Sequence, residues 1–485
     1  MIPQPFTRRS LLAAAAGLAT AGGLGLWEGS AHAEQTSSAR AGTGRPIRDW
    51  RAVAKDVRGE LLHTWNAYKR LAWGHDHLLP VTGGHGEFFD DAHPVGLTIV
   101  EALDTLYLMR LDDELAQGVE WIKDNLDFGA VDADVQVFET NIRMVGGLLS
   151  GYLATRERAL LGHARRIADI LLPCFERSPT GIPYRFVNPS TGEISGVTNP
   201  LAEVGTIIAE FGTLSRLTGD TKYYRAAKKA MKAVIDRRSD LDLLGTQINV
   251  ETGQWVNGTA TIHPPVDSFF EYVWDAWDLF GDTDFRSWYE ILTDAILEHE
   301  ATTIGGHLWF VRVDKDAGDV VRTDQSELGS FYAGLLGQSG HRRVGDAYLT
   351  SWTSVLDRYP VLPEGYEPVT GAATEKGNQL RPEYVDSCLN LWLVTGRDNP
   401  AADKYRKLAF DYYVRQKRHS RVANGWTVIT DVTTSPVKHG DLTSGYWWSE
   451  QMKYWYLMFA DTPRFDYDHN YLSTEGNVFR GLLRH

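Results

Sequence analysis

The chain has 485 residues, 43% of them hydrophobic and 11% aromatic, enough to fill a large core. Its formal net charge is −14 and basic residues form no long block, which argues against nucleic acid and anionic membranes as partners. The only cysteines, Cys174 and Cys388, lie in apolar helical runs, so we expect both thiols to pack as small hydrophobic groups rather than form a disulfide.

Residues 1–33 have the pattern of a twin-arginine signal peptide. Arg8 and Arg9 precede an Ala/Gly/Leu stretch, and Ala31-His32-Ala33 is typical of a small-residue cleavage site. Residues 34–46 are predicted to be a flexible lead-in, and residues 47–485 a single domain. No later apolar run approaches the ~18 residues of a membrane span. We therefore expect a soluble, monomeric bacterial protein that is exported to the periplasm or beyond the cell.

Apolar residues then recur with helical periodicity in about fourteen segments. The predicted helices span residues 50–72, 96–110, 112–127, 136–155, 158–175, 202–218, 221–239, 266–280, 284–299, 326–338, 342–358, 380–396, 399–419 and 446–459. Short joins such as 217–223, 279–285 and 394–398 place Gly at the end of one helix and Asp or Thr before the next. Helices joined this tightly must be antiparallel neighbours.

In most of these pairs the first helix is the more apolar and the second carries more charge. A ring of such pairs would bury the first helices inside the second, so we predict an all-α fold, an (α/α)7 barrel. Longer links with alternating, strand-like sequence lie between the pairs, at 246–262, 305–314 and 425–433. We expect them to form short β-hairpins on one face of the ring, opposite the tight joins. Links of this length are usually functional.

Three acids stand at the start of predicted inner helices, at the ends served by the long links. They are Glu139, Asp267 and Glu383, with Arg143 and Arg381 close by in sequence. Each acid alone is most simply a helix-start residue, favoured by the helix dipole. Together they would point into one mouth of the ring. Paired carboxylates beside aromatic rings suit glycoside hydrolysis, in which one donates a proton and another activates water.

A series of motifs makes the pattern more specific. In chain order these are AWGHDHLLP (72–80), GLTIVEALDTLYLM (96–109), VFETNIRMVGGLLSGYL (137–153), GIPY and VN (181–188), AEVGTIIAEFGTLSRLTGD (202–220), DSFFEYVW (267–274), GHLWF (306–310), LRPEYVDS (380–387), SEQMKYWYLMF (449–459) and STEG (473–476). In content and order they resemble glycoside hydrolase family 47, the class I α-1,2-mannosidases. That family's fold is an (α/α)7 barrel, in agreement with the helix count.

The resemblance implies roles for the three acids. Glu139 would be the general acid, acting through a water, and Glu383 would activate the attacking water. Asp267 is the other candidate base, and the sequence does not decide between the two. Arg143 and Arg381 would position these carboxylates and the sugar. Since the acids come from separate helix starts around a wide ring, we expect the roughly 6.5–9.5 Å carboxylate spacing of an inverting enzyme.

The resemblance also implies a calcium ion. Thr474 would bind Ca²⁺ through its hydroxyl and carbonyl oxygens, and Glu475 would hold the waters of the ion, which takes six to eight oxygen ligands. Glu450 would bind the innermost sugar or its waters, and His307 would lie beside the site. The implied activity is a calcium-dependent, inverting exo-α-1,2-mannosidase that removes terminal mannose from oligosaccharides, N-glycans or mannans.

Some positions depart from the family's usual pattern. Asp386 stands where Glu is usual, and Tyr446, in the divergent stretch TSGYWWSE, stands where the floor of the site usually has Phe. Pro265 takes the place of an arginine that helps some members choose among glycan branches. These changes leave the chemistry at the terminal mannose in place and put the floor and the outer contacts in question.

Two other functions are compatible with parts of the sequence. The segment 74–94 contains His75, His77, His85 and His93 among acids, a composition that could bind zinc in a metal-dependent enzyme. Alternatively, the barrel could bind mannose-containing glycans with weak or lost turnover, because a fold alone does not guarantee chemistry. Hydrolysis of an α-1,2-linked mannobiose would separate these possibilities.

Overall fold

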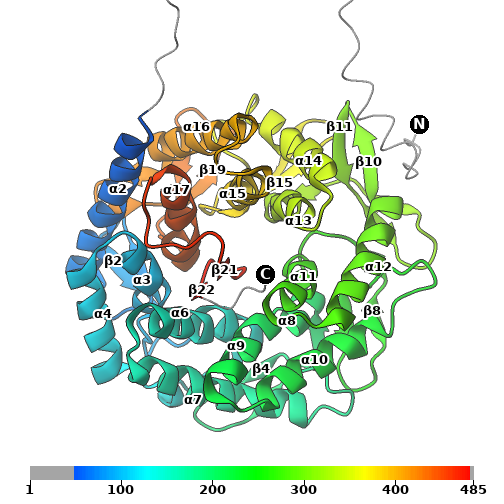
Figure 1. Ribbon diagram of the computed structural model, residues 1–485, viewed down its shortest axis with the longest axis horizontal. Coiled ribbons are helices and arrows are strands. Elements are labelled where there is room, and N and C mark those ends of the chain that lie inside the picture. Colours follow the sequence, from blue (N-terminus) through cyan, green and yellow to red (C-terminus); the bar gives the residue numbers. More distant parts are fainter. Residues whose placement is uncertain (1–48, 481–485) are drawn as a thin grey trace, which may run out of the picture.

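The computed structural model describes residues 49–480, whose helices close into a ring of two concentric layers (Figure 1). The inner helices are α3 (Leu97–Leu108), α6 (Gly146–Thr155), α9 (Ile208–Thr218), α11 (Ser268–Phe280), α13 (Tyr332–Gln338), α15 (Glu383–Thr395) and α17 (Met452–Phe459). The outer helices are α2 (Trp50–Leu71), α4 (Asp112–Asn125), α7 (Arg158–Glu176), α10 (Lys222–Ile235), α12 (Thr283–His299), α14 (Arg342–Val355) and α16 (Asp403–Ser420). The predicted (α/α)7 barrel is confirmed.

The pattern of burial explains why the inner helices are more apolar in sequence than the outer helices. In the inner helix α3 every residue except Tyr107 is buried, because the helix is enclosed by its neighbours in both layers. In the outer helix α4 only Leu115, Gly118 and Ile122 are buried. These three residues recur every three or four positions, so they form one apolar stripe that faces the inner layer.

The tight joins behave largely as predicted. Gly219 and Gly281 end α9 and α11 in the left-handed conformation, with φ of 76° and 62°, which a residue with a side chain adopts only with strain. Asp282 then caps α12 by accepting a hydrogen bond from the amide of Asp284. Gly396 differs from the prediction: its φ is 95° but its ψ is 115°, so α15 ends in a more extended turn.

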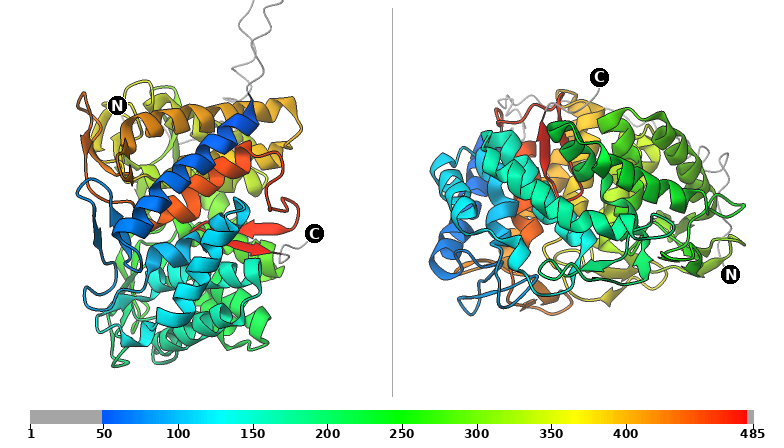
Figure 2. Two further views of the ribbon diagram at one scale, coloured as in Figure 1. Left: turned by 90° about the vertical axis from the view of Figure 1, so that its left-hand side faces the viewer. Right: turned by 90° about the horizontal axis from the view of Figure 1, so that it is seen from below.

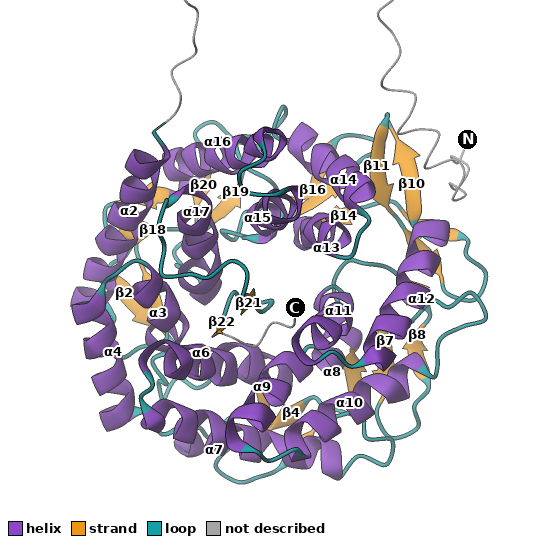
Figure 3. Ribbon diagram, in the orientation of Figure 1, coloured by secondary structure: helices purple, strands orange, loops and turns teal. Residues whose placement is uncertain are grey.

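The long links contain short antiparallel strands, which Figure 3 shows between and outside the helices. They are β1 (His77–Leu79), β2 (Gly84–Gly86), β3 (Val135–Gln136), β4 (Phe186–Val187), β5 (Ile194–Ser195), β6 (Thr198–Pro200), β7 (Gln247–Asn249), β8 (Trp255–Asn257), β9 (Thr259–Ala260), β10 (Ala301–Ile304), β11 (His307–Phe310), β12 (Arg312–Asp314), β13 (Val320–Arg322), β14 (Gln325–Ser326), β15 (Gly365–Glu367), β16 (Ala372–Glu375), β17 (Arg421–Val422), β18 (Gly425–Trp426), β19 (Ile429–Asp431) and β20 (Lys438–His439). The three predicted extended links are therefore confirmed.

A hairpin that the sequence did not reveal enters the ring from the other end (Figure 2). It consists of β21 (Asn470–Leu472) and β22 (Val478–Arg480), and the residues before it share a groove with the short joins of the barrel. Its backbone is anchored at Asp104 of α3, whose Oδ2 accepts a 2.7 Å hydrogen bond from the amide of Val478. The hairpin closes this end of the barrel.

Gly146, the first residue of α6, makes room for the same hairpin. A Cβ atom at Gly146 would lie 2.5 Å from Nδ2 of Asn477, the residue before β22. That nitrogen instead donates a 2.9 Å hydrogen bond to the carbonyl of Ile142. Gly146 is therefore required by the close approach of the hairpin to the helix.

Three further expectations concern the chain as a whole. Cys174 and Cys388 are both buried and free, as expected. Among the described residues, no helix is both long and apolar enough to cross a bilayer. The predicted signal peptide (1–33) and lead-in (34–46) lie outside the described residues.

Candidate active site

The ring encloses a cavity of about 230 Å³ at the ends of the inner helices that receive the long links. Ten of the eleven predicted site residues line it: Glu139, Arg143, Asp267, Arg381, Glu383, Asp386, Tyr446, Glu450, Thr474 and Glu475. The exception is His307. The fold therefore brings together residues that are more than 300 positions apart in the sequence.

His307 lies elsewhere. It begins β11 and pairs with Ile304 across the β10–β11 hairpin, which Figure 1 shows at the outer edge of the ring. It does not line the cavity. Nothing in this arrangement supports the role beside the site that the resemblance implied for it.

Two turns of π-helix carry residues of the cavity. Glu139 ends the short helix α5 (Val137–Glu139), and Thr140–Val145, which includes Arg143, then forms a π-helical turn before α6. A second π-helical turn, Trp447–Gln451, follows Tyr446 and contains Glu450. Such turns are rare and often occur at functional sites, because they place one extra residue in a helical turn.

Glu139 does not act as a helix cap. Its carboxylate makes no capping bond to a helix amide and lies 2.7 Å from Nε of Arg143, one turn further on. Arg143 also contacts Glu101 at 2.8 Å and forms a very short ion pair with Glu475. Glu101 and Glu475 are almost fully buried, whereas 23% of the Glu139 side chain is exposed. Glu139 is therefore the most exposed carboxylate of this network.

Asp267 and Glu383 are buried carboxyls whose pKa values are raised. Asp267 precedes α11 without making a side-chain capping bond, and burial raises its pKa to about 6. Glu383 is the first residue of α15, and burial raises its pKa to about 7 against the opposing charge of Arg381. Glu383 also shares a hydrogen bond with the buried carboxyl of Glu327. The raised pKa values of Asp267 and Glu383 lie near neutral pH, as those of acid–base groups in active sites often do.

Tyr446 and Arg381 form one wall of the cavity. The Arg381 guanidinium lies 5.2 Å from the centre of the Tyr446 ring, and its Nε lies 2.9 Å from Oε2 of Glu364. The hydroxyl of Tyr446 donates a 2.6 Å hydrogen bond to the carbonyl of Gln379. Because this bond satisfies the additional hydroxyl, the ring can still serve as the aromatic floor that Phe usually provides.

Asp386 and Glu450 lie deeper in the cavity. Asp386 accepts bonds of 2.9 and 3.0 Å from Nδ2 of Asn390, and burial raises its pKa to about 7. Glu450 accepts a 3.1 Å bond from the hydroxyl of Tyr454, which also lines the cavity. Burial and the neighbouring charge of Glu475 raise the pKa of Glu450 well above its usual range.

Two further acids line the cavity that were not predicted from the sequence, Glu271 and Glu203. Glu271 follows Asp267 by one helical turn, and this spacing on one face of α11 could have revealed it. Its carboxyl is hydrogen-bonded to Thr474, and burial raises its pKa well above the usual range. Glu203 belongs to the short helix α8 (Leu201–Gly205) and is held by two bonds from Arg185, of 2.8 and 2.6 Å.

The cavity therefore has an excess of negative charge. Eight carboxyl side chains line it, namely Glu139, Glu203, Asp267, Glu271, Glu383, Asp386, Glu450 and Glu475, against the two guanidinium groups of Arg143 and Arg381. Buried carboxylates without a counter-charge are costly, so they must take up protons or a cation. A set of carboxylate and hydroxyl oxygens is the kind that a hard divalent cation such as Ca²⁺ or Mg²⁺ prefers.

The fold and the acid-lined cavity define a family. Residues 60–481 match the family model of Glycosyl hydrolase family 47, and the chain belongs to this family. It is a glycoside hydrolase.

Named relatives agree with this assignment. The human mannosyl-oligosaccharide 1,2-alpha-mannosidase IB is 32% identical over 456 residues, which are 88% of this chain and 70% of that protein. The pig mannosyl-oligosaccharide 1,2-alpha-mannosidase IA is 30% identical over 474 residues, 90% of this chain and 69% of that one. The solved α-1,2-mannosidase from Trichoderma reesei superposes with a TM-score of 0.79 at 23% identity, covering 88% of this chain and 99% of that structure.

Proposed function

We propose that the protein is a calcium-dependent, inverting exo-α-1,2-mannosidase. The observation that carries the proposal is the convergence of Glu139, Asp267 and Glu383 on one cavity with an excess of carboxylates. The names of the relatives supply the sugar and the linkage. The substrate class is α-1,2-mannosyl oligosaccharides, including N-glycans and mannans.

Glu139 is the proposed general acid, acting through a water. Its carboxyl is 2.7 Å from Nε of Arg143, and 23% of its side chain is exposed. Of the three acids, Glu139 is the one that Arg143 holds in place. A proton delivered to the leaving oxygen lets the glycosidic bond break without forming a free alkoxide.

Glu383 is the proposed base. Its carboxyl lines the cavity, where it can accept a proton from an attacking water. A pKa near 7 allows the ionised form to be populated at neutral pH and still accept that proton efficiently. Asp267 is the second candidate, and its pKa of about 6 is compatible with the same task.

The calcium proposal rests on the donor set around Thr474. Thr474 lines the cavity together with Glu271, Glu450 and Glu475, and all three carboxyls have strongly raised pKa values in the protein alone. A cation would remove the cost of ionising these groups. When bound, calcium would supply a site that coordinates sugar hydroxyls and so orients the terminal mannose.

The closed end of the barrel supports the proposed exo mode. The β21–β22 hairpin closes the ring on one side, so a glycan reaches the cavity from the side of the long links (Figure 2). A cavity of about 230 Å³ with one open side accommodates the end of a glycan rather than its middle.

Hydrolysis of α-1,2-mannobiose by the purified protein tests the proposal. We expect free mannose, first as the β-anomer by proton NMR, with activity lost in EDTA and restored by Ca²⁺ but not Zn²⁺. Initial α-mannose would contradict inversion, and full activity in EDTA would contradict the calcium requirement. Binding of mannobiose without turnover would favour the alternative, a glycan-binding barrel.

Export and the monomeric state are further proposals, supported by the twin-arginine pattern and the single ring. We expect the mature protein outside the cytoplasm to begin near Glu34, which N-terminal sequencing would show. Size-exclusion chromatography should give the mass of one chain. A cytoplasmic protein that retains residues 1–33, or a stable dimer, would contradict these expectations.

A further inference from the structure

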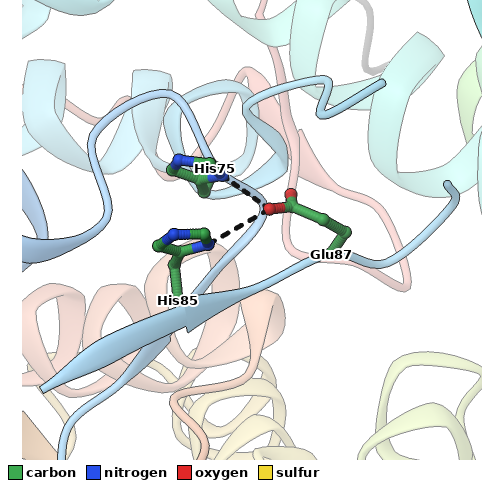
Figure 4. Close-up of side chains that lie close together, drawn as sticks. All are labelled: His75, His85 and Glu87. Carbon is green, nitrogen blue, oxygen red and sulfur yellow. Dashed lines mark hydrogen bonds and ion pairs between the residues drawn. The ribbon is translucent and has the colours of Figure 1, made fainter. Parts of the chain in front are cut away.

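A second group of potential metal ligands lies outside the cavity, on the link between α2 and α3. Figure 4 shows His75, His85 and Glu87 turned toward one another. Nδ1 of His75 and Nδ1 of His85 lie 2.5 and 3.3 Å from the same oxygen, Oε1 of Glu87. The two imidazole rings are stacked, with centroids 3.5 Å apart and an angle of 15° between their planes.

We propose that this cluster, His75–His85–Glu87, binds a divalent transition-metal ion of the zinc class. Two imidazoles and one carboxylate form a frequent zinc donor set, and all three ligand atoms already lie within 4.8 Å of one another. Bonds of about 2.0–2.1 Å in a tetrahedron place ligand atoms roughly 3.3 Å apart. The His85–Glu87 pair has this spacing, and the His75–Glu87 pair needs to open by less than about 1 Å.

The cluster is accessible to an ion. The side chain of His75 is 34% exposed and that of His85 is 46% exposed, so an ion can reach the site and a water can fill the fourth position. The cluster contains one carboxylate and two neutral ligands, and this softer donor set distinguishes it from the all-oxygen cavity.

The backbone already holds the three ligands in place. The hydroxyl of Tyr68 donates a 2.7 Å bond to the carbonyl of His75, and Oε2 of Glu87 accepts a 3.1 Å bond from the amide of Asp76. His85 is fixed opposite Leu78 in the β1–β2 hairpin. Little conformational entropy is therefore lost when an ion binds, and the bond from Asp76 leaves Oε1 of Glu87 facing the imidazoles.

The other two histidines of the segment have different surroundings. The ring of His77 is mostly buried and packs edge-on against Phe88, with centroids 5.6 Å apart. His93 pairs with Asp90 at 2.6 Å. Of the histidines in residues 74–94, only His75 and His85 therefore lie together with an acid, Glu87. None of these three residues lines the cavity.

An ion at this cluster would restrain a segment that contacts Arg143, one of the residues that line the cavity. Phe88 directly follows Glu87, and its amide donates a 3.0 Å bond to Oδ2 of Asp76. The ring of Phe88 lies 5.3 Å from the guanidinium of Arg143, which contacts Glu139. The ion would fix residues 75–88 against this arginine without touching the substrate.

Zinc binding by the full chain in excess Ca²⁺ tests the proposal, because calcium occupies the oxygen ligands of the cavity. Isothermal titration should give one zinc per chain. His85→Gln should weaken this binding by more than about 100-fold, since losing a group that merely orients a ligand already costs 10–100-fold. His93→Gln is the matched control, an exposed histidine–carboxylate pair in the same link, and should bind zinc as the wild type does.

Thermal denaturation gives a second readout that does not depend on mannosidase activity. Zinc should raise the Tm of the wild type and of His93→Gln, and should leave the Tm of His85→Gln unchanged. The proposal is overturned if the wild type binds no zinc in the presence of calcium, or if His85→Gln binds it as tightly and is stabilised as much. Loss of hydrolysis would instead bear on the proposed function alone.

Discussion

Arg143 donates a 2.7 Å hydrogen bond from Nε to Oε2 of Glu139, one helical turn before it. The same guanidinium contacts Glu101 from α3 and Glu475 from the C-terminal hairpin. The position of Glu139 therefore depends on three separate parts of the chain. This relationship makes Glu139 a positioned carboxylate rather than a solvated helix-start residue.

Glu139→Gln should reduce turnover of α-1,2-mannobiose by roughly 10²–10⁴-fold, because the amide cannot deliver a proton. It should leave the Tm almost unchanged, since the amide oxygen can still accept the bond from Arg143. The measurement is kcat by mannose release, with Tm as the folding control. Turnover like that of the wild type would make Glu139 a structural residue.

A substrate whose leaving group needs no proton distinguishes the residue that acts as general acid from the residue that acts as base. A mannosyl fluoride needs no protonation, so Glu139→Gln should recover much of its lost rate on this substrate. Glu383→Gln should remain slow, because the attacking water still needs a base. Asp267→Asn is the matched comparison. If Glu383→Gln is fast on the fluoride and Asp267→Asn slow, the base is Asp267.

The Tm gain from calcium should depend on pH. Glu271, Glu450 and Glu475, the carboxyls proposed to lie around the ion, have pKa values raised well above their ordinary 4.5. A carboxyl group whose pKa is raised by folding stabilises the metal-free fold at pH values below its pKa in the unfolded chain. This contribution is lost as the pH rises through the pKa of the same group in the folded protein. Calcium requires the ionised form, so its Tm gain over EDTA should be larger at pH 8 than at pH 5. Equal gains at both values would contradict this linkage.

Thr474 should control calcium affinity through its oxygen atoms. Thr474→Ser keeps the hydroxyl and should bind Ca²⁺ within a few-fold of the wild type, whereas Thr474→Val keeps the shape but loses a ligand. We expect Thr474→Val to weaken Ca²⁺ by more than about tenfold, measured by titration of the metal-free protein. Similar affinities for the two variants would place the ion elsewhere.

The buried pair Lys453–Asp104 should be the main attachment of the C-terminal hairpin. Nζ of Lys453 lies 2.7 Å from Oδ1 of Asp104, with 0% and 2% of these side chains exposed, and also bonds the carbonyl of Gly476. Lys453→Met leaves a buried carboxylate without its partner, which should cost about 3–5 kcal/mol of stability.

Thermal or chemical denaturation measures this effect. Lys232→Met is the control, because Lys232 forms an exposed ion pair with Asp236 at the C-terminal end of α10 and such pairs contribute little. Adding Asp104→Asn to Lys453→Met should restore part of the loss, because the uncompensated charge is removed. A single variant as stable as the wild type would show that the hairpin is held by other contacts.

The helices could be predicted because burial in this fold is one-sided in the outer layer and nearly complete in the inner one. The apolar stripe of α4 and the apolar run of α3 express this difference directly in the sequence. The strands of the long links were also visible as alternating residues. The β21–β22 hairpin was not, because its position depends on Asp104 and Lys453, which lie far from it in the sequence.

The site residues likewise divide into those that could be predicted from the local sequence and those that depend on contacts formed only in the folded chain. Glu139, Asp267 and Glu383 could be predicted because each begins a recognisable helix. His307 could not be placed, since its position depends on how the β10–β11 hairpin packs against the ring. The partnership of His75 and His85 depends on strand register, which pairs His85 with Leu78 and brings it back beside the start of the link.

The β21–β22 hairpin also gives the protein an order of events during translation. The chain is made from residue 1 onward, so every inner and outer helix of the ring is synthesised before Thr474 and Glu475. Until translation passes these residues, the cavity lacks its proposed calcium ligand and Arg143 lacks one of its three carboxylate partners. A nascent chain that has not yet reached Thr474 therefore has an incomplete cavity, however much of the ring has already folded.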